Sequence, residues 1–382
     1  MTRSALAFAR VCAALVALGI VVSGCSTGGS RPSSDTSSVV HARTLDSALV
    51  TTAIEDYIGH GSVGLRNIRA VLVSVDGVTQ VAYYRDGLPT DRAHVFSVTK
   101  SVLSTLVGIA LEEGVLKDLS QDLRTLLPEY GPGMSEAVAS ITVEQLLTMT
   151  SGLPEGTLEE DPRLDRPDWV REVLRGGTAA RPGTTWNYSD PAADVLAAVL
   201  TAALERHDGK NPRSLLDFAR EKLFDPLEIQ SRPAYVGFEG NDPLSVRFND
   251  QGFGWATDHR RRHYGCCMLK LAAADMVKIG ELYLQDGRWN GHQIISENWV
   301  AAATTPIPQE SSYGRMWWIR DIGVHHAFFA DGRGGQLIAV VPDLKLVVAI
   351  SSLLDVENET NKYLLGQDLL PMVNDVVLSR LE

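Results

Sequence analysis

Ser97 and Lys100 stand three positions apart and are the pair of side chains in this sequence best suited to covalent catalysis. Residues at this spacing lie on one face of a helix. The lysine amine can therefore accept the proton of the serine hydroxyl and convert it into a nucleophile. At a helix N-terminus the backbone N–H of Ser97 would also lack a helical partner and could bind developing negative charge. The alternative is an N-capping serine beside a solvated lysine.

The segment that follows favours catalysis over capping. Apolar residues occupy most faces of the predicted helix: Val102, Leu103, Leu106, Val107 and Ala110. Lys100 would then be at least partly buried, which is costly for a charged group unless the site uses it.

Several other catalytic patterns are missing from the sequence. Beyond residue 44 it contains no Gly-x-Ser-x-Gly nucleophile elbow, and the whole sequence contains no P-loop and no His-Glu-x-x-His zinc motif. His259 and His263 could share a helix face, but the run Arg260-Arg261-Arg262 between them would repel a metal cation. We interpret this run as a solvated basic loop, or alternatively as a dock for an anionic substrate group. The sequence therefore predicts neither a metal nor a cofactor.

Two later strings complete a pattern with Ser97 and Lys100. Trp186-Asn187-Tyr188-Ser189-Asp190 precedes a predicted helix, and Asp331-Gly332-Arg333-Gly334-Gly335-Gln336 leads into a predicted strand. Together they resemble the serine β-lactamase-like superfamily, which includes class C β-lactamases, D-alanyl-D-alanine peptidases, related esterases and 6-aminohexanoate-dimer hydrolases. The resemblance covers roughly residues 60–355. Further similar strings lie at 146–153, 273–280 and 290–300.

The resemblance implies a role for each of these residues. Ser97 would be the acylated nucleophile, Lys100 its partner, and Tyr188 the shared general base and acid. The backbone N–H groups of Ser97 and Gln336 would form the oxyanion hole. The residues implied to contact substrate are Trp186, Asp190, Arg333, Gly334 and Gly335, although Trp186 could instead pack beneath Tyr188.

The sequence departs from the superfamily pattern at three positions. Asp190 replaces the commoner asparagine, and Met149 stands where many relatives have histidine. Arg333 occupies the place of a lysine or histidine, and it cannot give up a proton, so we expect an anion clamp there. The sequence also contains neither a Lys-[Ser/Thr]-Gly nor a Ser-Asp-Asn string, so we do not expect a standard class A β-lactamase.

Activation of Ser97 requires a basic group. Free lysine and tyrosine are almost fully protonated at pH 7, and deprotonating either costs about 4 kcal/mol. If Arg333 lay near Lys100, like charge would lower the pKa of the lysine. Both cations would favour the Tyr188 phenolate. We therefore expect the site to drive Lys100 and Tyr188 toward their basic forms.

The remaining pattern predicts a mixed α/β (α+β) fold, with one antiparallel sheet built from both ends of the chain and an inserted, mostly helical region. Runs around Asp76-Gly77 predict a hairpin of Ile68–Val75 and Val78–Tyr84. Further strands are expected at Arg315–Arg320, Phe328–Phe329, Leu337–Val341 and Lys345–Ser351. Helices are expected at Val98–Glu113, from Thr142 to a stop at Ser151-Gly152, and at Ala192–Arg206, Ser214–Leu223, Ala272–Leu284 and about Lys362–Leu381. The sheet part would span about residues 45–95 and 270–382, and the helical part about 96–269.

The first residues have the pattern of an export signal. Arg3 and Arg10 precede the apolar run Val11–Val22, which is too short for a comfortable transmembrane helix. Val22-Ser23-Gly24-Cys25 resembles a bacterial lipobox. Residues 1–24 would then be a lipoprotein signal peptide, Cys25 the lipidated residue, 25–44 a flexible tether and 45–382 the catalytic domain. The alternative is an ordinary secretory signal with a chance cysteine.

Composition and cysteine content limit the partners. The chain has 382 residues and a formal net charge of −12, which excludes a generally basic nucleic-acid binder. Cys266 and Cys267 are neighbours, closer together than most disulfides allow, so we interpret them as two buried thiols. The expected partners are a small-molecule or peptide substrate and a membrane, reached through Cys25.

We therefore expect an exported cell-membrane lipoprotein, on the outer face or in the periplasm, that hydrolyses an amide or ester bond through a Ser97 acyl-enzyme. An amidase or esterase similar to 6-aminohexanoate-dimer hydrolases is favoured over a true β-lactamase. The alternative is a lipid-anchored, catalytically weak envelope module similar to penicillin-binding proteins.

Overall fold

The computed structural model describes residues 43–154, 168–232, 235–237, 254–258, 260–355 and 358–381. The chain divides into two units, Met1–His41 and Ala42–Glu382, and the described residues belong to the second. The expected signal peptide with Cys25, nearly all of the tether, and His259 therefore lie outside the described residues.

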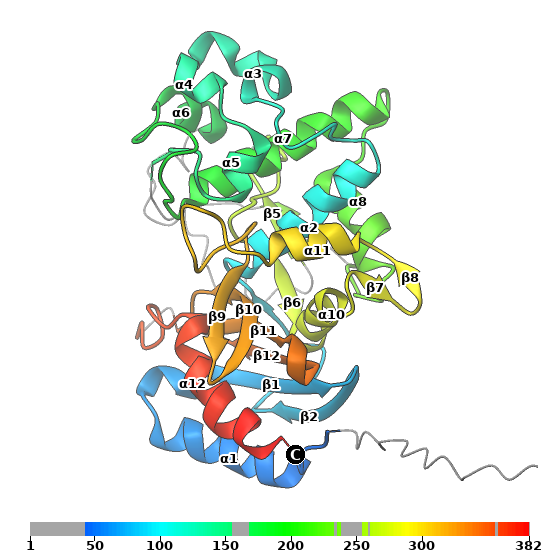
Figure 1. The fold of residues 1–382 in the computed structure, drawn as a ribbon, viewed down its shortest axis with the longest axis vertical. Coiled ribbons are helices and arrows are strands. Elements are labelled where there is room, and N and C mark those ends of the chain that lie inside the picture. Colours follow the sequence, from blue (N-terminus) through cyan, green and yellow to red (C-terminus); the bar gives the residue numbers. More distant parts are fainter. Residues whose placement is uncertain are drawn as a thin grey trace, which may run out of the picture. The chain divides into compact units, whose positions relative to one another are not determined.

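A six-stranded sheet organises the second unit, in the order β2-β1-β12-β11-β10-β9 with antiparallel neighbours (Figure 1). Its strands are β1 (Ile68–Val75), β2 (Val78–Tyr84), β9 (Trp318–Ile322), β10 (His325–Gly332), β11 (Gln336–Val341) and β12 (Leu346–Ser352). Because β1 pairs with β12, early and late parts of the chain meet in the middle of the sheet. This confirms the predicted fold class.

The β1–β2 hairpin has the predicted bounds. Asp76 and Gly77 connect its strands with φ values of 50° and 78°. Positive φ at both turn residues matches the right-handed twist of paired strands, and Asp-Gly is a preferred pair for such turns.

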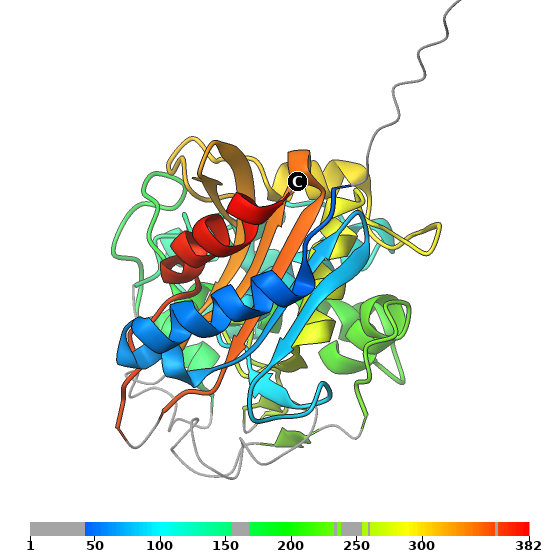
Figure 2. The ribbon, with the colours of Figure 1, turned by 90° about the horizontal axis from the view of Figure 1, so that it is seen from below.

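Both faces of the sheet are buried, because successive side chains of a strand point to opposite faces. Val71 and Val73 pack in a cluster with α1 (Ser47–His60) and the C-terminal segment, whereas Ala70 and Leu72 join the larger cluster around α2 (Val98–Glu112). Figure 2 shows α1 and the C-terminal segment side by side across the first face. That segment consists of η7 (Gly366–Leu369), α12 (Leu370–Met372), η8 (Val373–Val377) and η9 (Leu378–Arg380).

The inserted region is mostly helical, as predicted, and α2 is its innermost helix. Every residue from Val98 to Ala110 is buried. The other elements before the last strands are η1 (Val63–Asn67), β3 (Arg92–His94), α3 (Leu123–Leu126), η2 (Pro128–Gly133), α4 (Glu136–Ala139), α5 (Val143–Leu147), α6 (Trp169–Arg175), α7 (Asp190–Asp208), α8 (Leu215–Ala219), η5 (Arg220–Phe224), β4 (Tyr235–Gly237), β5 (Gly254–Thr257), β6 (Lys270–Ala272), α10 (Ala273–Leu284), β7 (Arg288–Trp289), β8 (His292–Gln293) and α11 (Glu297–Ala303). Strand β3 pairs with β6, and the short η6 (Pro342–Leu344) links β11 to β12.

Two predicted elements have wrong bounds because a residue adopts a left-handed backbone. The strand expected at Arg315–Arg320 begins only at Trp318, and Met316 just before it has φ 61°. The helix expected to run from Thr142 to Ser151 ends at Leu147, because Met149 has φ 56°.

The predicted C-terminal helix, about Lys362–Leu381, is confirmed only from Gly366 to Arg380, where 3₁₀, α and π turns follow one another. Regular turns begin only at Gly366. The carbonyl oxygen of Leu364 accepts the N–H groups of Gly334 and Gly335 at 2.7 and 3.1 Å. These bonds hold the chain before Gly366 against the β10–β11 turn, so it cannot coil into a helix.

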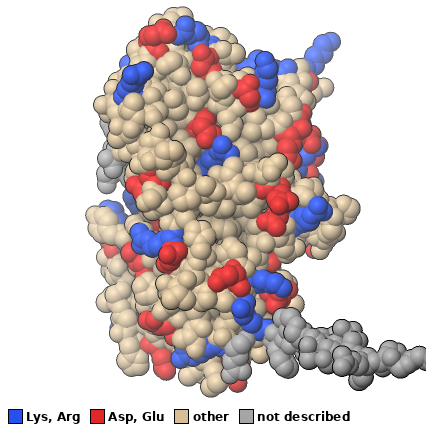
Figure 3. Space-filling model, in the orientation of Figure 1, with Lys and Arg blue, Asp and Glu red and all other residues tan. Residues whose placement is uncertain are grey.

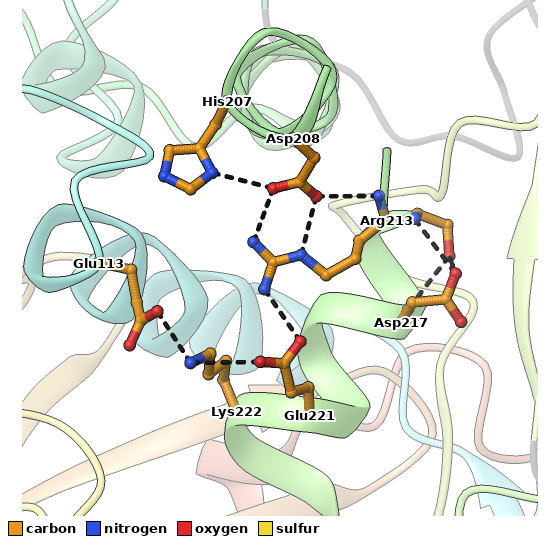
Figure 4. Close-up of polar contacts among 8 residues, drawn as sticks. Glu113, His207, Asp208, Arg213, Asp217, Glu221 and Lys222 are labelled. Atoms are coloured by element: carbon orange, nitrogen blue, oxygen red, sulfur yellow. Dashed lines mark hydrogen bonds and ion pairs between the residues drawn. The ribbon is translucent and has the colours of Figure 1, made fainter. Parts of the chain in front are cut away.

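An ion-pair network ties together the ends of three helical elements (Figure 4). Arg213 donates to the two carboxylate oxygens of Asp208 at 2.8 and 2.9 Å and to Glu221 at 3.0 Å. Lys222 lies 3.3 Å from Glu221 and 2.8 Å from Glu113. The network thus connects the end of α7, the turn after α8, and the end of α2, and so braces the two helices that carry the site.

Several features bear on possible ligands. Gly59, Gly61 and Gly64 have the spacing of a dinucleotide-binding loop, but Gly59 lies in the last turn of α1, so this string follows a helix rather than a strand. Among the described residues, no helix is long and apolar enough to cross a membrane, and no group of three or more His, Cys, Asp and Glu could hold a metal ion. On the face drawn in Figure 3, acidic and basic side chains of the described residues are intermixed.

Candidate active site

Ser97 stands immediately before α2 and is half-buried. Its side chain makes no capping hydrogen bond to the helix, so the N-capping alternative is wrong. The preceding residue, Phe96, has φ 47°. This left-handed conformation is uncommon for a bulky residue and clusters at functional sites, where the surrounding structure enforces it.

Lys100 is enclosed behind Ser97, with 1% of its surface exposed. Its Nζ donates to Ser97 Oγ at 2.9 Å, to Asp190 Oδ1 at 2.6 Å and to the Cys266 carbonyl oxygen at 2.9 Å. An ammonium has three N–H groups, so these acceptors satisfy it completely. The solvated-lysine alternative is therefore wrong as well.

Tyr188 reaches the same cluster from the segment before α7. Its ring centroid lies 4.8 Å from Lys100 Nζ, and its hydroxyl interacts with both Ser97 and Lys100. Trp186 and Trp318 pack against the ring, with centroid distances of 6.5 and 5.6 Å. The structure thus brings the three predicted catalytic side chains together.

Asp190 is placed by the start of α7. Ser189 caps this helix by accepting the N–H of Ala192 at 3.2 Å, and a capped N-terminus fixes the direction of the first turn. Asp190, the first residue of α7 and 8% exposed, then contacts Lys100.

The electrostatics of this cluster differ from the expectation. Burial acts to lower the pKa of Lys100, but the charge and hydrogen bond of Asp190 outweigh it, and the pKa of Lys100 lies well above its ordinary value. Burial raises the pKa of Tyr188, and the neighbouring Lys100 offsets this only in part. The prediction that both groups are driven toward their basic forms is therefore wrong. The physical reason is that Lys100 contacts the carboxylate of Asp190 rather than the guanidinium of Arg333.

A pocket of about 290 Å³ opens in front of Ser97. This volume lies at the small end of the range for small-molecule sites. Its lining residues are Phe96, Ser97, Tyr188, Asp190, Cys267, Trp318, Asp331, Arg333, Leu365 and Gln367. Four of the predicted site residues therefore share one cavity: Ser97, Tyr188, Asp190 and Arg333.

Three residues implied to contact substrate lie beside the pocket rather than in its lining. Trp186 packs against Tyr188, as the alternative interpretation expected. Gly334 and Gly335 bind the Leu364 carbonyl through their N–H groups. Substrate contact by Trp186 and the two glycines stays a prediction.

Gln336 is fully buried at the start of β11. Its side-chain amide bonds the backbone of Ser352 at 2.7 and 3.3 Å. Its strand partner is Gly332, where a Cβ would lie 2.4 Å from the Val95 carbonyl oxygen. This close approach brings the end of β10 against the segment that leads to Ser97. The oxyanion hole from the N–H groups of Ser97 and Gln336 stays a prediction.

Asp331 lines the pocket but was not predicted as a site residue. It lies near the end of β10 and opens the string Asp331–Gln336, and its place in that string is the signal that could have identified it. It is 7% exposed, and its carboxylate accepts the N–H groups of Gly366 at 2.7 Å and Gln367 at 3.3 Å. Burial raises the pKa of Asp331 to about 6. Leu365 and Gln367 were also missed, because their turn has no sequence pattern that indicates a site.

Cys266 and Cys267 are buried free thiols with their sulfur atoms 2.6 Å apart, which confirms the interpretation. Burial raises the pKa of both. Asp194 Oδ1 accepts the N–H groups of Gly265 and Cys266 at 2.6 and 2.9 Å. These bonds orient the Cys266 carbonyl that Lys100 contacts.

Two residues of the run Arg260-Arg261-Arg262, Arg260 and Arg262, contact acidic side chains. Arg262 contacts Asp258 at 2.6 Å and Asp168 at 2.9 Å, and its side chain is 11% exposed. The solvated-loop interpretation is therefore wrong for Arg262.

His263 is buried, its Nδ1 lies 3.0 Å from the Trp255 carbonyl oxygen, and burial lowers its pKa to about 4.

A larger hollow of about 940 Å³ lies between the β1–β2 hairpin and α10. An ion pair of Lys345 and Asp76 at 2.7 Å borders it. None of the predicted site residues lines it. The smaller pocket is the candidate active site, because the Ser97 hydroxyl, the Lys100 ammonium and the Tyr188 phenol meet at it.

Known proteins share this architecture. A 6-aminohexanoate-dimer hydrolase from Paenarthrobacter ureafaciens is 24% identical over 276 residues, which cover 64% of this chain and 64% of that protein. The chain thus matches slightly less than two thirds of that relative's length.

Two solved structures extend the comparison. A D-stereospecific amidohydrolase from Streptomyces sp. superposes with a TM-score of 0.57 at 18% identity, covering 80% of this chain and 94% of the other. FmtA from Staphylococcus aureus superposes with a TM-score of 0.60 at 17% identity, covering 89% and 92%. At such identities the likeness shows the fold alone. A family model, Beta-lactamase, matches residues 67–370, from the start of β1 into the C-terminal segment. On this match over most of its length, the chain belongs to the Beta-lactamase family.

Proposed function

We propose that the protein is a serine hydrolase that cleaves an amide or ester bond through an acyl-enzyme on Ser97. The observation that carries this proposal is the 2.9 Å hydrogen bond from Lys100 Nζ to Ser97 Oγ, at the edge of a pocket that Tyr188 also lines. Membership of the Beta-lactamase family supports it.

In the proposed first step, Ser97 Oγ bonds to the acyl carbon and its proton passes to Tyr188 or Lys100. The π electron pair of the carbonyl group moves to its oxygen. Each backbone N–H of an oxyanion hole stabilises the resulting negative charge in the transition state by about 2.7–4 kcal/mol. The leaving group departs with the returned proton, and water releases the acid by the same path. Because Asp190 holds Lys100 as an ammonium, Tyr188 is the favoured first acceptor. It must first lose its own hydroxyl proton to solvent, since its pKa is raised, and the Lys100 ammonium stabilises the phenolate that then accepts the Ser97 proton.

An amidase or esterase is favoured over a true β-lactamase. Arg333 stands where a proton-donating lysine or histidine would be expected, and a guanidinium does not release its proton. The relative from Paenarthrobacter ureafaciens is named for hydrolysis of a 6-aminohexanoate dimer rather than of a β-lactam.

Covalent labelling tests the proposal. A fluorophosphonate probe should label the wild-type chain, and Ser97→Ala should abolish the label. Ser101→Ala is the matched control, because Ser101 lies on the same helix but donates to the Met316 carbonyl oxygen at 2.7 Å. Labelling that persists in Ser97→Ala would refute the assignment.

A second candidate is a catalytically weak envelope module. It is favoured by the raised pKa values of Lys100 and Tyr188, because neither group is basic at rest. Hydrolysis of a p-nitrophenyl ester distinguishes these two candidate functions. A hydrolase releases many equivalents of nitrophenol per protein chain, whereas the weak module releases about one equivalent and stops.

We further propose that Cys25 anchors the chain to the bacterial cell membrane. Its support is the sequence Val22-Ser23-Gly24-Cys25 and the tether that follows. Incorporation of a labelled fatty acid in bacteria, lost in Cys25→Ser, would support the anchor, and equal labelling of the variant would contradict it.

A further inference from the structure

His94 is a buried histidine that contacts two of the segments that line the catalytic pocket. It is the last residue of β3 and is 5% exposed. Its ring stacks on the ring of Phe96, with the centroids 3.8 Å apart and the planes at 29°. Its Nε2 accepts the backbone N–H of Met268 at 2.8 Å. One imidazole thus joins the residue before Ser97 to the residue after Cys267, and both Ser97 and Cys267 line the pocket.

Both residues that His94 contacts have a left-handed backbone. The φ value of Phe96 is 47° and that of Met268 is 68°. This conformation is strained for residues other than glycine, and it persists only where surrounding contacts enforce it. The stacked ring and the hydrogen bond are contacts of this kind. His94 therefore holds the two strained positions that set the direction of the chain beside Ser97 and Cys267.

His94 also completes a ring of contacts around the nucleophile. Two residues before Met268, the carbonyl oxygen of Cys266 accepts from Lys100 Nζ at 2.9 Å. The same Nζ donates to Ser97 Oγ at 2.9 Å. Because His94 holds the backbone beside both ends of this chain of hydrogen bonds, it fixes the distance that the chain must span.

The hydrogen bond to Met268 requires one form of the imidazole. A backbone N–H can only donate, so Nε2 must carry a lone pair and the proton must be on Nδ1. Burial and the positive charges of Lys270 and Arg333 lower the pKa of His94 to about 3. The ring therefore stays neutral, and Nε2 stays an acceptor, at neutral and mildly acidic pH.

We propose that His94 is a positioning residue for the hydrolysis proposed above, and that it aligns Ser97 with the Lys100 ammonium. It acts through the backbone of Phe96 and Met268 and does not line the pocket. The proposal rests on the acyl-enzyme function of Ser97. A displacement of about 1 Å at a reacting group can slow a reaction by about 10²-fold, so the loss of this brace should be visible in the rate of acylation.

The rate at which a fluorophosphonate labels the full-length chain measures this alignment. His94→Phe keeps a ring on Phe96 but leaves the Met268 N–H without its acceptor, so labelling at saturating probe should slow by about tenfold or more. The probe concentration for half-maximal rate should change less than about twofold, because every residue that lines the pocket is retained. His94→Gln places an amide oxygen near the position of Nε2 and should restore the rate to within about threefold of wild type. An unchanged rate in His94→Phe, or an equal loss in His94→Gln, would overturn the proposal.

His263→Phe is the matched control. His263 is also a buried histidine, 4% exposed, and its Nδ1 lies 3.0 Å from the carbonyl oxygen of Trp255. Neither His263 nor Trp255 lines the pocket. The labelling rate of this variant should stay within about twofold of wild type. An equal slowing in His94→Phe and His263→Phe would mean that any lost buried imidazole has this effect, and would overturn the proposal.

Nitrogen NMR of the wild-type chain covers the case in which His94→Phe fails to fold. The His94 ring, assigned through its contact with Phe96, should carry its proton on Nδ1 and show a neutral Nε2 from pH 5 to pH 8. A proton on Nε2, or titration of this ring near the ordinary pKa of 6.5, would overturn the proposal. The labelling test of Ser97→Ala separates the two proposals: if that variant is unlabelled while His94→Phe reacts at the wild-type rate, the hydrolase stands and the role of His94 falls.

Discussion

Lys100 Nζ lies 2.6 Å from Asp190 Oδ1, in a buried ion pair between residues 90 positions apart. It joins the first turn of α2 to the first residue of α7. The pair sets the charge state behind Ser97, because it stabilises the ammonium form of the lysine.

Removing one partner of this pair should destabilise the fold. Lys100→Met leaves the Asp190 carboxylate buried without its cation, and breaking a buried pair in this way costs about 3–5 kcal/mol. Denaturant unfolding monitored by circular dichroism measures the loss. The double variant Lys100→Met/Asp190→Asn should recover much of it, because no unpaired charge remains. Equal stability of the single and double variants would contradict this account.

Tyr188→Phe should lower kcat by at least about 10²-fold, the lower end of what general acid–base groups contribute. Phenylalanine keeps the ring that Trp186 and Trp318 contact, so the free energy of unfolding should change little. Steady-state hydrolysis of a p-nitrophenyl ester measures kcat. An unchanged rate would remove Tyr188 from the mechanism.

Arg333→Ala should raise KM for anionic substrates. Arg333 lines the pocket, and loss of a charge-assisted contact to a carboxylate weakens binding by about tenfold or more. The measurement compares a p-nitrophenyl ester that carries a carboxylate with a neutral ester of similar size. Arg320→Ala is the control, because Arg320 is an exposed residue of β9 that does not line the pocket. A similar change in KM for both esters would count against an anion clamp.

Stability should depend on pH through Asp331. Its folded-state pKa of about 6 lies above the ordinary value of 3.8, so the folded chain binds this proton more tightly than the unfolded chain. The resulting contribution to the free energy of unfolding is complete below pH 4 and is lost as the pH rises through 6. The loss is about 3 kcal/mol.

Asp331→Asn has no such titration, and its amide can still accept a backbone N–H. The free energy of unfolding of wild type minus that of Asp331→Asn should therefore fall between pH 4 and pH 7. Urea unfolding of both chains at pH 4, 5.5 and 7 measures this difference. A difference that stays constant would show that Asp331 does not titrate in this range.

Local spacing in the sequence determined much of the fold. The hairpin at Asp76-Gly77 has the predicted bounds, because a turn that needs positive φ at both residues is a property of adjacent residues. Helix α2 was predicted to within one residue, since its apolar side chains continue until Gly114 stops it. Elements interrupted by an isolated left-handed residue, such as Met149 and Met316, could not be predicted, because tertiary contacts and not local preference hold such residues in that conformation.

The sequence by itself determined which side chains could do the chemistry, since Ser97 and Lys100 are set by helix spacing and Tyr188 by its motif. Only the tertiary structure decided their charge states and the character of the pocket. The neighbour of Lys100 is Asp190 rather than Arg333, and Asp331 joins the pocket from a strand end. These outcomes depend on burial and on distances between residues far apart in the chain, because a pKa responds to the charges and solvent around a group in space.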